Sequence, residues 1–261
     1  MLAKKVLEPR YLEWNRRWGA PYGREGRILD PRGLQGTPDS GLSGEIARQG
    51  VFCLQPNNDT RVFEYPWAWH AAELRGPMRV LEIGGGLSGF PFALSREGHR
   101  VENVDPGVGW FVSPGATAAL NRVFATDVTL HHCRIEDATL EPGAYDRVFS
   151  LSVLEHLHPD AAAAAMAKAA HALAPGGLAV LTVDLFLDLV PFSRKVENHW
   201  GRNVSIESLI DPRRFEMVRG LEAELYGFPG FDAREVLANL PDYYLGGGYP
   251  TLIQTIVLRR R

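Results

Sequence analysis

Residues 80–105 read VLEIGGGLSGFPFALSREGHRVENVD, and this stretch decides the fold. Its first apolar run ends at Glu82 and Ile83, and glycines follow at positions 84, 85, 86 and 89. A helix-length segment comes next, and a second apolar run ends at Asp105. Strand, glycine loop, helix and strand in this order predict a βαβ unit whose loop binds a ligand at the carboxyl end of the first strand.

Glu82 and Asp105 narrow the choice of ligand. A carboxylate at the tip of the second strand suits a ribose, because both ribose hydroxyls can donate hydrogen bonds to it. That geometry fits a nicotinamide dinucleotide and S-adenosylmethionine equally. A dinucleotide, however, places its pyrophosphate at the helix N-terminus, where a nearby acid such as Glu82 would oppose it. Glu82 therefore favours a cationic ligand with an amino acid tail.

The sequence beyond this stretch predicts an α/β fold. Short apolar runs alternate with helix-length segments from Met78 onward, which is typical of a mostly parallel, Rossmann-like doubly wound sheet with helices on both faces. A helix over 161–173 is expected to stop at Pro175-Gly176-Gly177. The last strand leaves no room for a crossover helix. The expected strands are residues 79–83, 100–104, 128–132, 145–151, 178–184, 215–225 and 251–259.

Three segments lie outside this regular pattern. Residues 1–75 are expected to form an irregular N-terminal extension or lid that contributes to the ligand site, with one helix at 9–18 and another beginning at Pro66, a residue suited to the first helical turn. Residues 76–261 form the predicted catalytic domain, with insertions at about 185–212 and 226–250. Long loops of this kind in a compact domain usually cover or bind a ligand.

Composition limits the possible partners. The 31 acidic residues slightly outnumber the 28 lysines and arginines, so no basic field for nucleic acid is expected. Cys53 and Cys133 lack the spacing of a zinc site, and no metal is expected. Because no segment offers about 18 uninterrupted apolar residues, we expect no membrane span and a cytoplasmic protein.

Five segments in order resemble the class I S-adenosylmethionine-dependent methyltransferases. VLEIGGGLSG resembles the glycine motif of that family, with Ser88 standing where a third glycine is usual. The resemblance continues through Asp105, and the terminal strand pair resembles the family's reversed last strand. The remaining segments are RIEDATL at 134–140, DRVFSLSVLEHL at 146–157 and LAPGGLAVLTV at 173–183.

The resemblance implies S-adenosylmethionine as cofactor and assigns residues to its parts. Glu82, Gly84, Gly85 and Gly86 would line the methionine moiety. Asp105 and Pro106 would hold the ribose, and Glu136 or Asp137, with Asp137 preferred, would face the adenine amino group. Ser150, Leu151 and Ser152 would run past the cofactor. The acid pattern of metal-binding members is broken, because Ser152 stands at one of its positions.

The sequence leaves the acceptor and the base open. His156 follows the fourth predicted strand and carries an imidazole, a group that can accept a proton near neutral pH, and His199 in the insertion is the second candidate. Tyr65, Trp200 and Tyr226 are expected to contact the acceptor, although aromatic residues in such loops often only pack. The predicted activity is methyl transfer to oxygen or nitrogen of a small metabolite, possibly a sugar-containing natural product. The alternatives are an NAD(P)-dependent reductase and a non-catalytic S-adenosylmethionine-binding module.

Overall fold

The computed structural model describes the whole chain except residues 35–39 and 108–111. The described residues form one seven-stranded sheet in the order β3-β2-β1-β4-β5-β7-β6. All neighbouring pairs from β3 to β5 are parallel, and β7 runs antiparallel to both β5 and β6. The predicted doubly wound sheet with a reversed last strand is therefore confirmed. The strands are β1 (Arg79–Ile83), β2 (Arg100–Val104), β3 (Thr129–His131), β4 (Tyr145–Leu151), β5 (Leu173–Phe186), β6 (Phe215–Arg219) and β7 (Thr251–Arg260).

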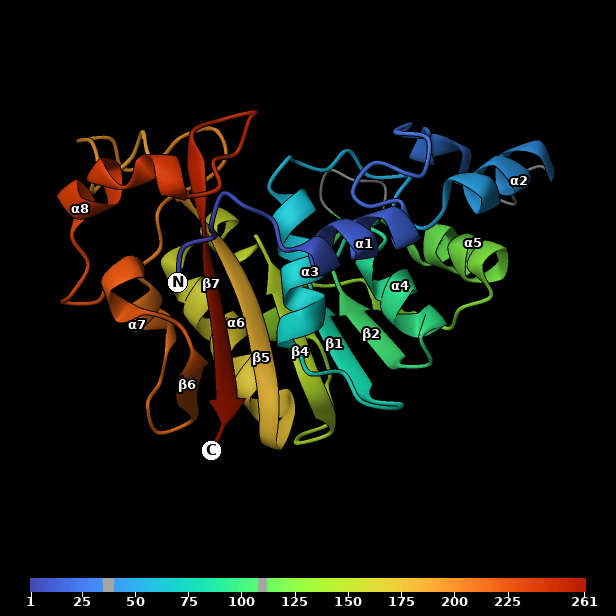
Figure 1. The fold of residues 1–261 in the computed structure, drawn as a ribbon. Helices are drawn as coiled ribbons and strands as arrows, with labels where there is room; N and C mark the ends of the chain where they lie inside the picture. Colours follow the sequence, from blue (N-terminus) through green and yellow to red (C-terminus); the bar gives the residue numbers. More distant parts are fainter. Residues whose placement is uncertain (35–39, 108–111) are drawn as a thin grey trace.

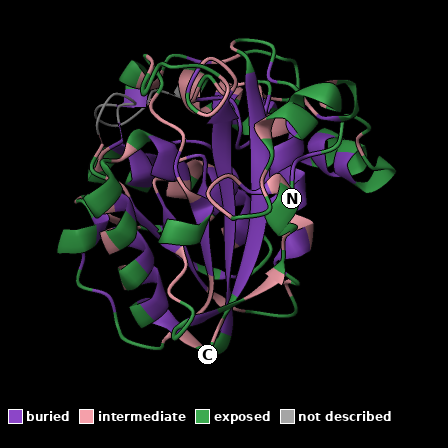
Figure 2. Ribbon diagram, turned by 90° about the vertical axis from the view of Figure 1, so that its left-hand side faces the viewer, coloured by how far each residue is buried: buried purple, intermediate pink, exposed green. Residues whose placement is uncertain are grey.

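Helices cover both faces of the sheet (Figure 1). One apolar cluster joins α1, α3, α4 and α5 to one face, and a second joins α6 and α7 to the other. Figure 2 shows the central strands buried between these layers, as expected for parallel strands that are apolar on both sides. The α-helices are α1 (Pro9–Trp18), α2 (Ser40–Gln49), α3 (Arg61–Ala71), α4 (Phe90–Arg96), α5 (Pro114–Phe124), α6 (Pro159–Ala172), α7 (Ile206–Leu209) and α8 (Ala233–Ala238). The short 3-10 helices are η1 (Pro31–Leu34), η2 (Ile135–Asp137), η3 (Leu154–His156), η4 (Glu222–Glu224) and η5 (Leu240–Asp242).

Helix α3, the second helix that the sequence predicts in the N-terminal region, begins earlier than predicted. Pro66 lies inside α3 rather than at its start. A proline in a helix leaves the carbonyl four residues earlier without its usual donor. Here that carbonyl belongs to Val62, and the Asn15 side-chain amide of α1 donates to it at 2.8 Å. The tertiary contact therefore allows the helix to pass through Pro66. The sequence pattern also does not predict helix α2.

Strand boundaries differ at two places. The structure begins β5 at Leu173, which pairs with Tyr145, and the register then shifts so that Arg147 pairs with Leu178. The Pro-Gly-Gly turn is therefore an irregularity near the start of this strand rather than a segment that precedes it. Strand β6 ends at Arg219, short of the expected residue 225, because the chain turns at Gly220 into η4.

The N-terminal region and both insertions meet at the carboxyl edge of the parallel strands, the upper edge in Figure 1. Tyr249 joins all three. Its hydroxyl donates to Asp184 Oδ2 at 2.6 Å and accepts from Asn58 Nδ2 at 3.0 Å, and its ring stacks on Trp200 at 5.0 Å. The carboxyl ends of β4 and β5 are thus covered by chain that lies far away in the sequence. No helix in the described ranges is both long enough and apolar enough to cross a membrane.

Candidate active site

The glycine loop after β1 has its backbone N–H groups occupied by the chain itself. Gly84 N–H donates to the Val104 carbonyl at 2.8 Å, and Gly85 N–H donates to Asn103 Oδ1 at 3.1 Å. Gly86 N–H donates to Asp105 Oδ2 at 2.9 Å, and Leu87 N–H donates to Gln55 Oε1 at 2.8 Å. A pyrophosphate needs free N–H groups at a helix N-terminus. These four groups belong to the loop before α4, which begins at Phe90, and none of them is free to bind a phosphate.

Two of the glycines are required by close approach. A Cβ on Gly84 would lie 2.7 Å from Val153 Cγ2, and one on Gly86 would lie 2.4 Å from Gln55 Oε1. Both residues also have positive φ, +72° and +57°, which side-chain-bearing residues rarely adopt. The loop therefore keeps its shape only with glycine at these positions.

Glu82 lies beneath this loop at the end of β1. Its carboxyl carbon is 2.7 Å from the position that a Cβ on Gly85 would take. Only 2% of the residue is exposed, and Oε2 has no hydrogen-bond partner within the described residues. Burial, and then the charge of Asp105, raise the pKa of Glu82 to about 8, while Arg61 acts in the opposite direction. A buried acid with a free oxygen suits a cationic ligand group.

Asp105 and the other predicted cofactor residues lie along the carboxyl edge of the sheet. Asp105 follows β2, is half-buried and also accepts from Gly107 N–H at 2.7 Å, and Pro106 beside it is exposed. Glu136 and Asp137 lie on η2 after β3, and both are exposed. Ser150 and Leu151 end β4 and are buried, and Ser150 Oγ has no partner among the described residues.

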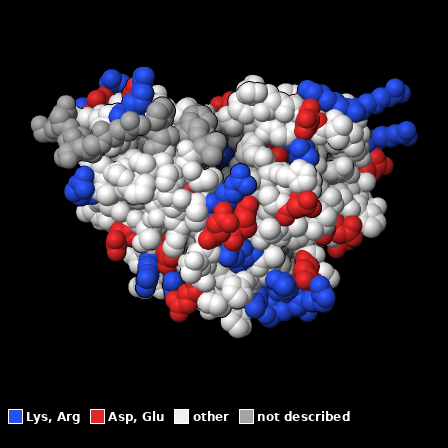
Figure 3. Space-filling view, turned by 180° about the vertical axis from the view of Figure 1, so that it is seen from behind, with Lys and Arg blue, Asp and Glu red and all other residues white. Residues whose placement is uncertain are grey.

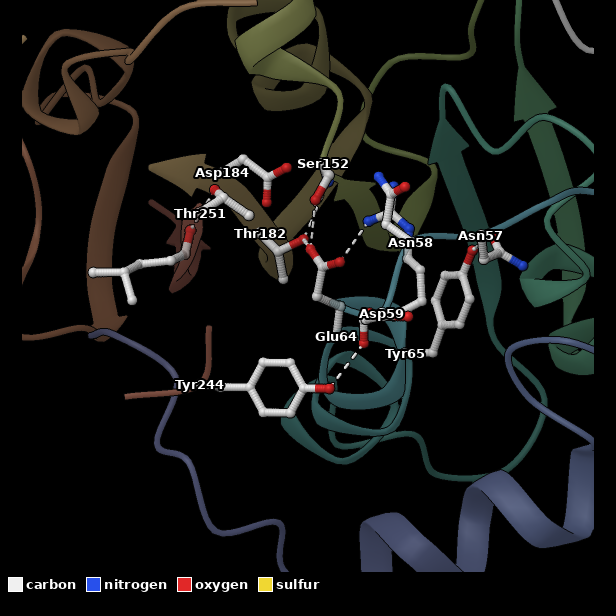
Figure 4. A network of polar contacts seen from close by, with 12 residues as sticks. Asn57, Asn58, Asp59, Glu64, Tyr65, Ser152, Thr182, Asp184, Tyr244 and Thr251 are labelled. Carbon is white, nitrogen blue, oxygen red and sulfur yellow. Dashed lines mark hydrogen bonds and ion pairs between the residues drawn. The ribbon is translucent and has the colours of Figure 1, made fainter. Parts of the chain in front are cut away.

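Ser152 takes part in a buried network centred on Glu64 (Figure 4). Glu64 is fully buried on α3, and its Oε1 accepts from Ser152 Oγ and Thr182 Oγ1, each at 2.5 Å. Its Oε2 accepts from Arg61 at 2.7 Å. Ser152 has a φ of +49°, a strained value for a residue with a side chain. The N-terminal region is therefore attached to the ends of β4 and β5 by a buried carboxylate.

The two candidate histidines lie on the surface near one tryptophan. His156 ends η3 and is exposed, and its Nδ1 is hydrogen-bonded to the Trp200 carbonyl. Because a carbonyl only accepts, Nδ1 carries the proton and Nε2 of the neutral ring keeps its lone pair. His199 is exposed and its ring meets the Trp200 ring edge-on at 5.2 Å. Both histidines thus lie beside the segment that covers β4.

The predicted acceptor aromatics occupy different surroundings. Trp200 is 40% exposed and stacks on Tyr249. Tyr65 is buried between Phe52 and Phe90, and its hydroxyl donates to Asn57 Oδ1 at 2.8 Å. Tyr226 is half-buried and packs edge-on against Phe231.

Besides Glu64, two further buried acids near the ends of β4 and β5 are missed by sequence reasoning. Glu155 on η3 is fully buried, and Asp184 on β5 is 1% exposed. Glu155 is next to His156 in the sequence, and the histidine is the more evident functional group of the two. For Asp184, the sequence predicts only that it ends a strand. These acids differ from ordinary surface acids because residues distant in the sequence bury them. No local sequence motif predicts this burial.

A family model described as a methyltransferase domain matches residues 64–215. This range includes the glycine loop, the buried acids and His156. The chain belongs to the methyltransferase domain family. No curated protein matches the chain.

Solved methyltransferase-like structures share the fold at low identity. Geranyl diphosphate C-methyltransferase from Streptomyces coelicolor A3(2), solved with Mg²⁺, geranyl-S-thiolodiphosphate and S-adenosyl-L-homocysteine, is 13% identical, with 99% of this chain and 95% of that chain covered and a TM-score of 0.52. The [4+2]-cyclase SpnF is 15% identical, with 75% of this chain and 79% of that chain covered and a TM-score of 0.52. The 1,6-didemethyltoxoflavin-N1-methyltransferase from Burkholderia thailandensis is 21% identical, with 70% of this chain and 71% of that chain covered and a TM-score of 0.48.

The protein is an S-adenosylmethionine-dependent methyltransferase. Glu82 has a buried oxygen without a partner among the described residues, which is the chemistry that a cationic amino acid group requires. Asp105 lies at the tip of β2, the position suited to a ribose. The occupied N–H groups of the loop argue against the reductase alternative on independent grounds.

Proposed function

We propose that this methyltransferase acts on an oxygen or nitrogen atom of a small-molecule metabolite, with sugar-containing natural products as one fitting class. The observation that carries the proposal is the polar character of the covered edge above β4 and β5. The edge is lined by polar rather than apolar residues, Glu64, Ser152, Tyr249 and Asp184, which are bonded mostly to one another, and Asp184 Oδ1 has no partner among the described residues. Such groups suit a hydroxylated or amino-bearing acceptor better than a hydrocarbon.

The cofactor assignments are part of the same proposal. Glu82 and the glycines of residues 84–86 bind the methionine portion, and Asp105 with Pro106 holds the ribose. Glu136 or Asp137 meets the adenine amino group, and Ser150 to Ser152 border the cofactor. When bound, S-adenosylmethionine supplies an electrophilic methyl group on a sulfonium.

The chain's own residues position the acceptor and remove its proton. His156 Nε2 accepts the proton that an acceptor hydroxyl or amine releases as its new bond to carbon forms, and the Trp200 carbonyl holds the ring in the required tautomer. The N-terminal region and the insertions at 185–212 and 226–250 exclude water, which favours in-line transfer. Tyr65, Trp200 and Tyr226 complete the proposed acceptor surroundings.

Binding and transfer experiments test this function in sequence. Calorimetry should detect saturable binding of S-adenosylmethionine and S-adenosylhomocysteine, but not of NADPH. Transfer of a labelled methyl group is then measured across a panel of hydroxylated and amino-bearing metabolites. Transfer to a carbon atom of the acceptor, established by mass spectrometry and NMR of the product, would contradict the proposed oxygen or nitrogen specificity.

The histidine assignment has its own test. Loss of a positioned base costs about 10² to 10⁴ in turnover, so His156→Ala should lower kcat by that order with unchanged cofactor affinity. His199→Ala should raise KM more than it lowers kcat if His199 only helps to cover the site. Near-normal turnover of His156→Ala together with an inactive His199→Ala would reverse the two roles.

A further inference from the structure

Glu155 and Asp184 leave three buried carboxylate oxygens without partners. Both Glu155 oxygens and Asp184 Oδ1 lack a hydrogen-bond partner among the described residues. The two residues lie at the ends of β4 and β5, where the chain leaves the parallel strands. Figure 4 shows Asp184 beside Ser152 and Thr182, within the covered polar network. A buried acceptor atom without a donor is costly, so such atoms point to a missing partner.

The charges around these acids do not balance. Arg61 is the cation whose charge reaches both Glu155 and Asp184, and it already forms an ion pair with Glu64 at 2.7 Å. Glu64 repels both acids in turn. Three carboxylates therefore face one guanidinium. The site lacks positive charge, which a ligand can supply.

Both acids resist ionisation in the free protein. Burial raises the pKa of Glu155 to about 8 and Glu64 acts in the same direction, whereas Arg61 and the nearby backbone N–H groups of Glu155 and Asp184, which do not reach hydrogen-bonding geometry, act against it. Burial and then Glu155 raise the pKa of Asp184. An adjacent cation would reverse these shifts, because opposite charge favours the ionised carboxylate.

We propose that Glu155 and Asp184 bind a protonated primary amine of the methyl acceptor. An ammonium group carries three N–H donors, and the site has three unpartnered oxygens. A protonated amine has no lone pair, so it anchors the acceptor while another oxygen or nitrogen atom receives the methyl group. Amino sugars and alkylamines that also carry a phenol have this chemistry. The inference rests on the proposed function and narrows its acceptor class.

Matched pairs of small molecules test the amine preference. The probes are glucosamine against glucose and tyramine against 4-ethylphenol, added to the full chain saturated with S-adenosylhomocysteine. Calorimetry should show that the amine of at least one pair binds at least about tenfold more tightly than its neutral partner. Equal binding within both pairs overturns the proposal, and so does the absence of any amine binding up to about 10 mM.

Isosteric variants show whether Glu155 and Asp184 cause the preference for the amine. Glu155→Gln and Asp184→Asn should each bring the amine-to-neutral ratio close to one, while Glu207→Gln and Asp160→Asn, at exposed positions, should retain it. S-adenosylhomocysteine affinity must remain unchanged in all four variants, which also shows that they fold. An unaltered ratio in both buried variants overturns the proposal.

Two further measurements distinguish an amine site from a sulfonium site and from a metal site. If the buried variants lose affinity for S-adenosylmethionine but not for S-adenosylhomocysteine, the carboxylates bind the sulfonium and the acceptor assignment is wrong. Binding of Mg²⁺ alone that the variants lose would assign the acids to a metal and overturn the amine site. Failure of the free chain to bind either cofactor form would instead contradict the proposed function itself.

Discussion

Asp105 has two tasks at the residue scale. Its carboxylate accepts from the N–H groups of Gly86 and Gly107, so it shapes the loop in addition to its proposed role of binding a ribose. Asp105→Asn replaces one acceptor oxygen by an N–H₂ group, and each charge-assisted bond lost costs about 1.5 to 3 kcal/mol. Calorimetry should therefore show at least a tenfold (about 1.4 kcal/mol) loss of S-adenosylhomocysteine affinity. Asp127→Asn, at an exposed position, is the control, and equal affinity of both variants would place the ribose elsewhere.

Gly89 offers a second residue-scale prediction, because its backbone is strained and crowded. Its φ is +92°, and a Cβ would lie 2.4 Å from the Val51 carbonyl oxygen. Gly98 has a similar φ of +88° with nothing within 4 Å of its Cβ position. Gly98→Ala should cost about 1 to 2 kcal/mol of unfolding free energy from backbone strain alone. Gly89→Ala should cost more, as measured by urea denaturation, and equal costs would show that the loop relaxes freely.

At the scale of elements, α1 supports the interior of α3. Asn15→Ala would leave the Val62 carbonyl without its donor, and an unsatisfied buried polar group costs about 1 to 3 kcal/mol. We expect the thermal midpoint to fall by about 2 to 4 °C for each kcal/mol. Asn239→Ala removes a similar bond, to the Glu235 carbonyl, at an exposed position and should change little. Equal midpoints for the two variants would mean that water replaces Asn15.

At the scale of the whole molecule, the outer surface and the covered edge of the sheet differ in how their acidic groups are compensated. Figure 3 shows acidic and basic residues interspersed on one face, in keeping with the formal net charge of -3. The acids that resist ionisation lie inside, where Glu82 and Glu155 have pKa values raised to about 8 from 4.5. Ligand recognition therefore depends on the interior edge of the sheet more than on the surface field.

This buried charge predicts how stability varies with pH. A carboxyl whose pKa is higher in the folded state stabilises the fold fully below about pH 4.5, and that contribution is lost as pH rises from about 4.5 to 8. The free chain should therefore have a lower thermal midpoint at pH 8 than at pH 5.5. Glu155→Gln removes one such group and should reduce the difference, whereas Glu207→Gln should not. An identical difference in all three proteins would show that Glu155 ionises freely.

Local sequence determined the alternation of strands and helices, the glycine loop and the positions of Glu82 and Asp105. Periodicity, glycines and acids at strand ends are short-range features, and each constrains the backbone next to it. The same features could not place Pro66 inside α3, because the compensating donor comes from Asn15 in another helix. They also mislocated the start of β5, where pairing between Leu173 and Tyr145 extends the strand beyond its glycine turn.

Only the tertiary structure distinguished Glu155 and Asp184 from other acids. Their chemistry depends on burial by the N-terminal region and both insertions, which meet at Tyr249. The same contacts set the tautomer of His156 and attach Glu64 to the ends of β4 and β5. A residue's type and neighbours in the sequence determine which groups it carries. Desolvation and unpaired charge arise from segments distant along the chain, so they exist only in the folded protein.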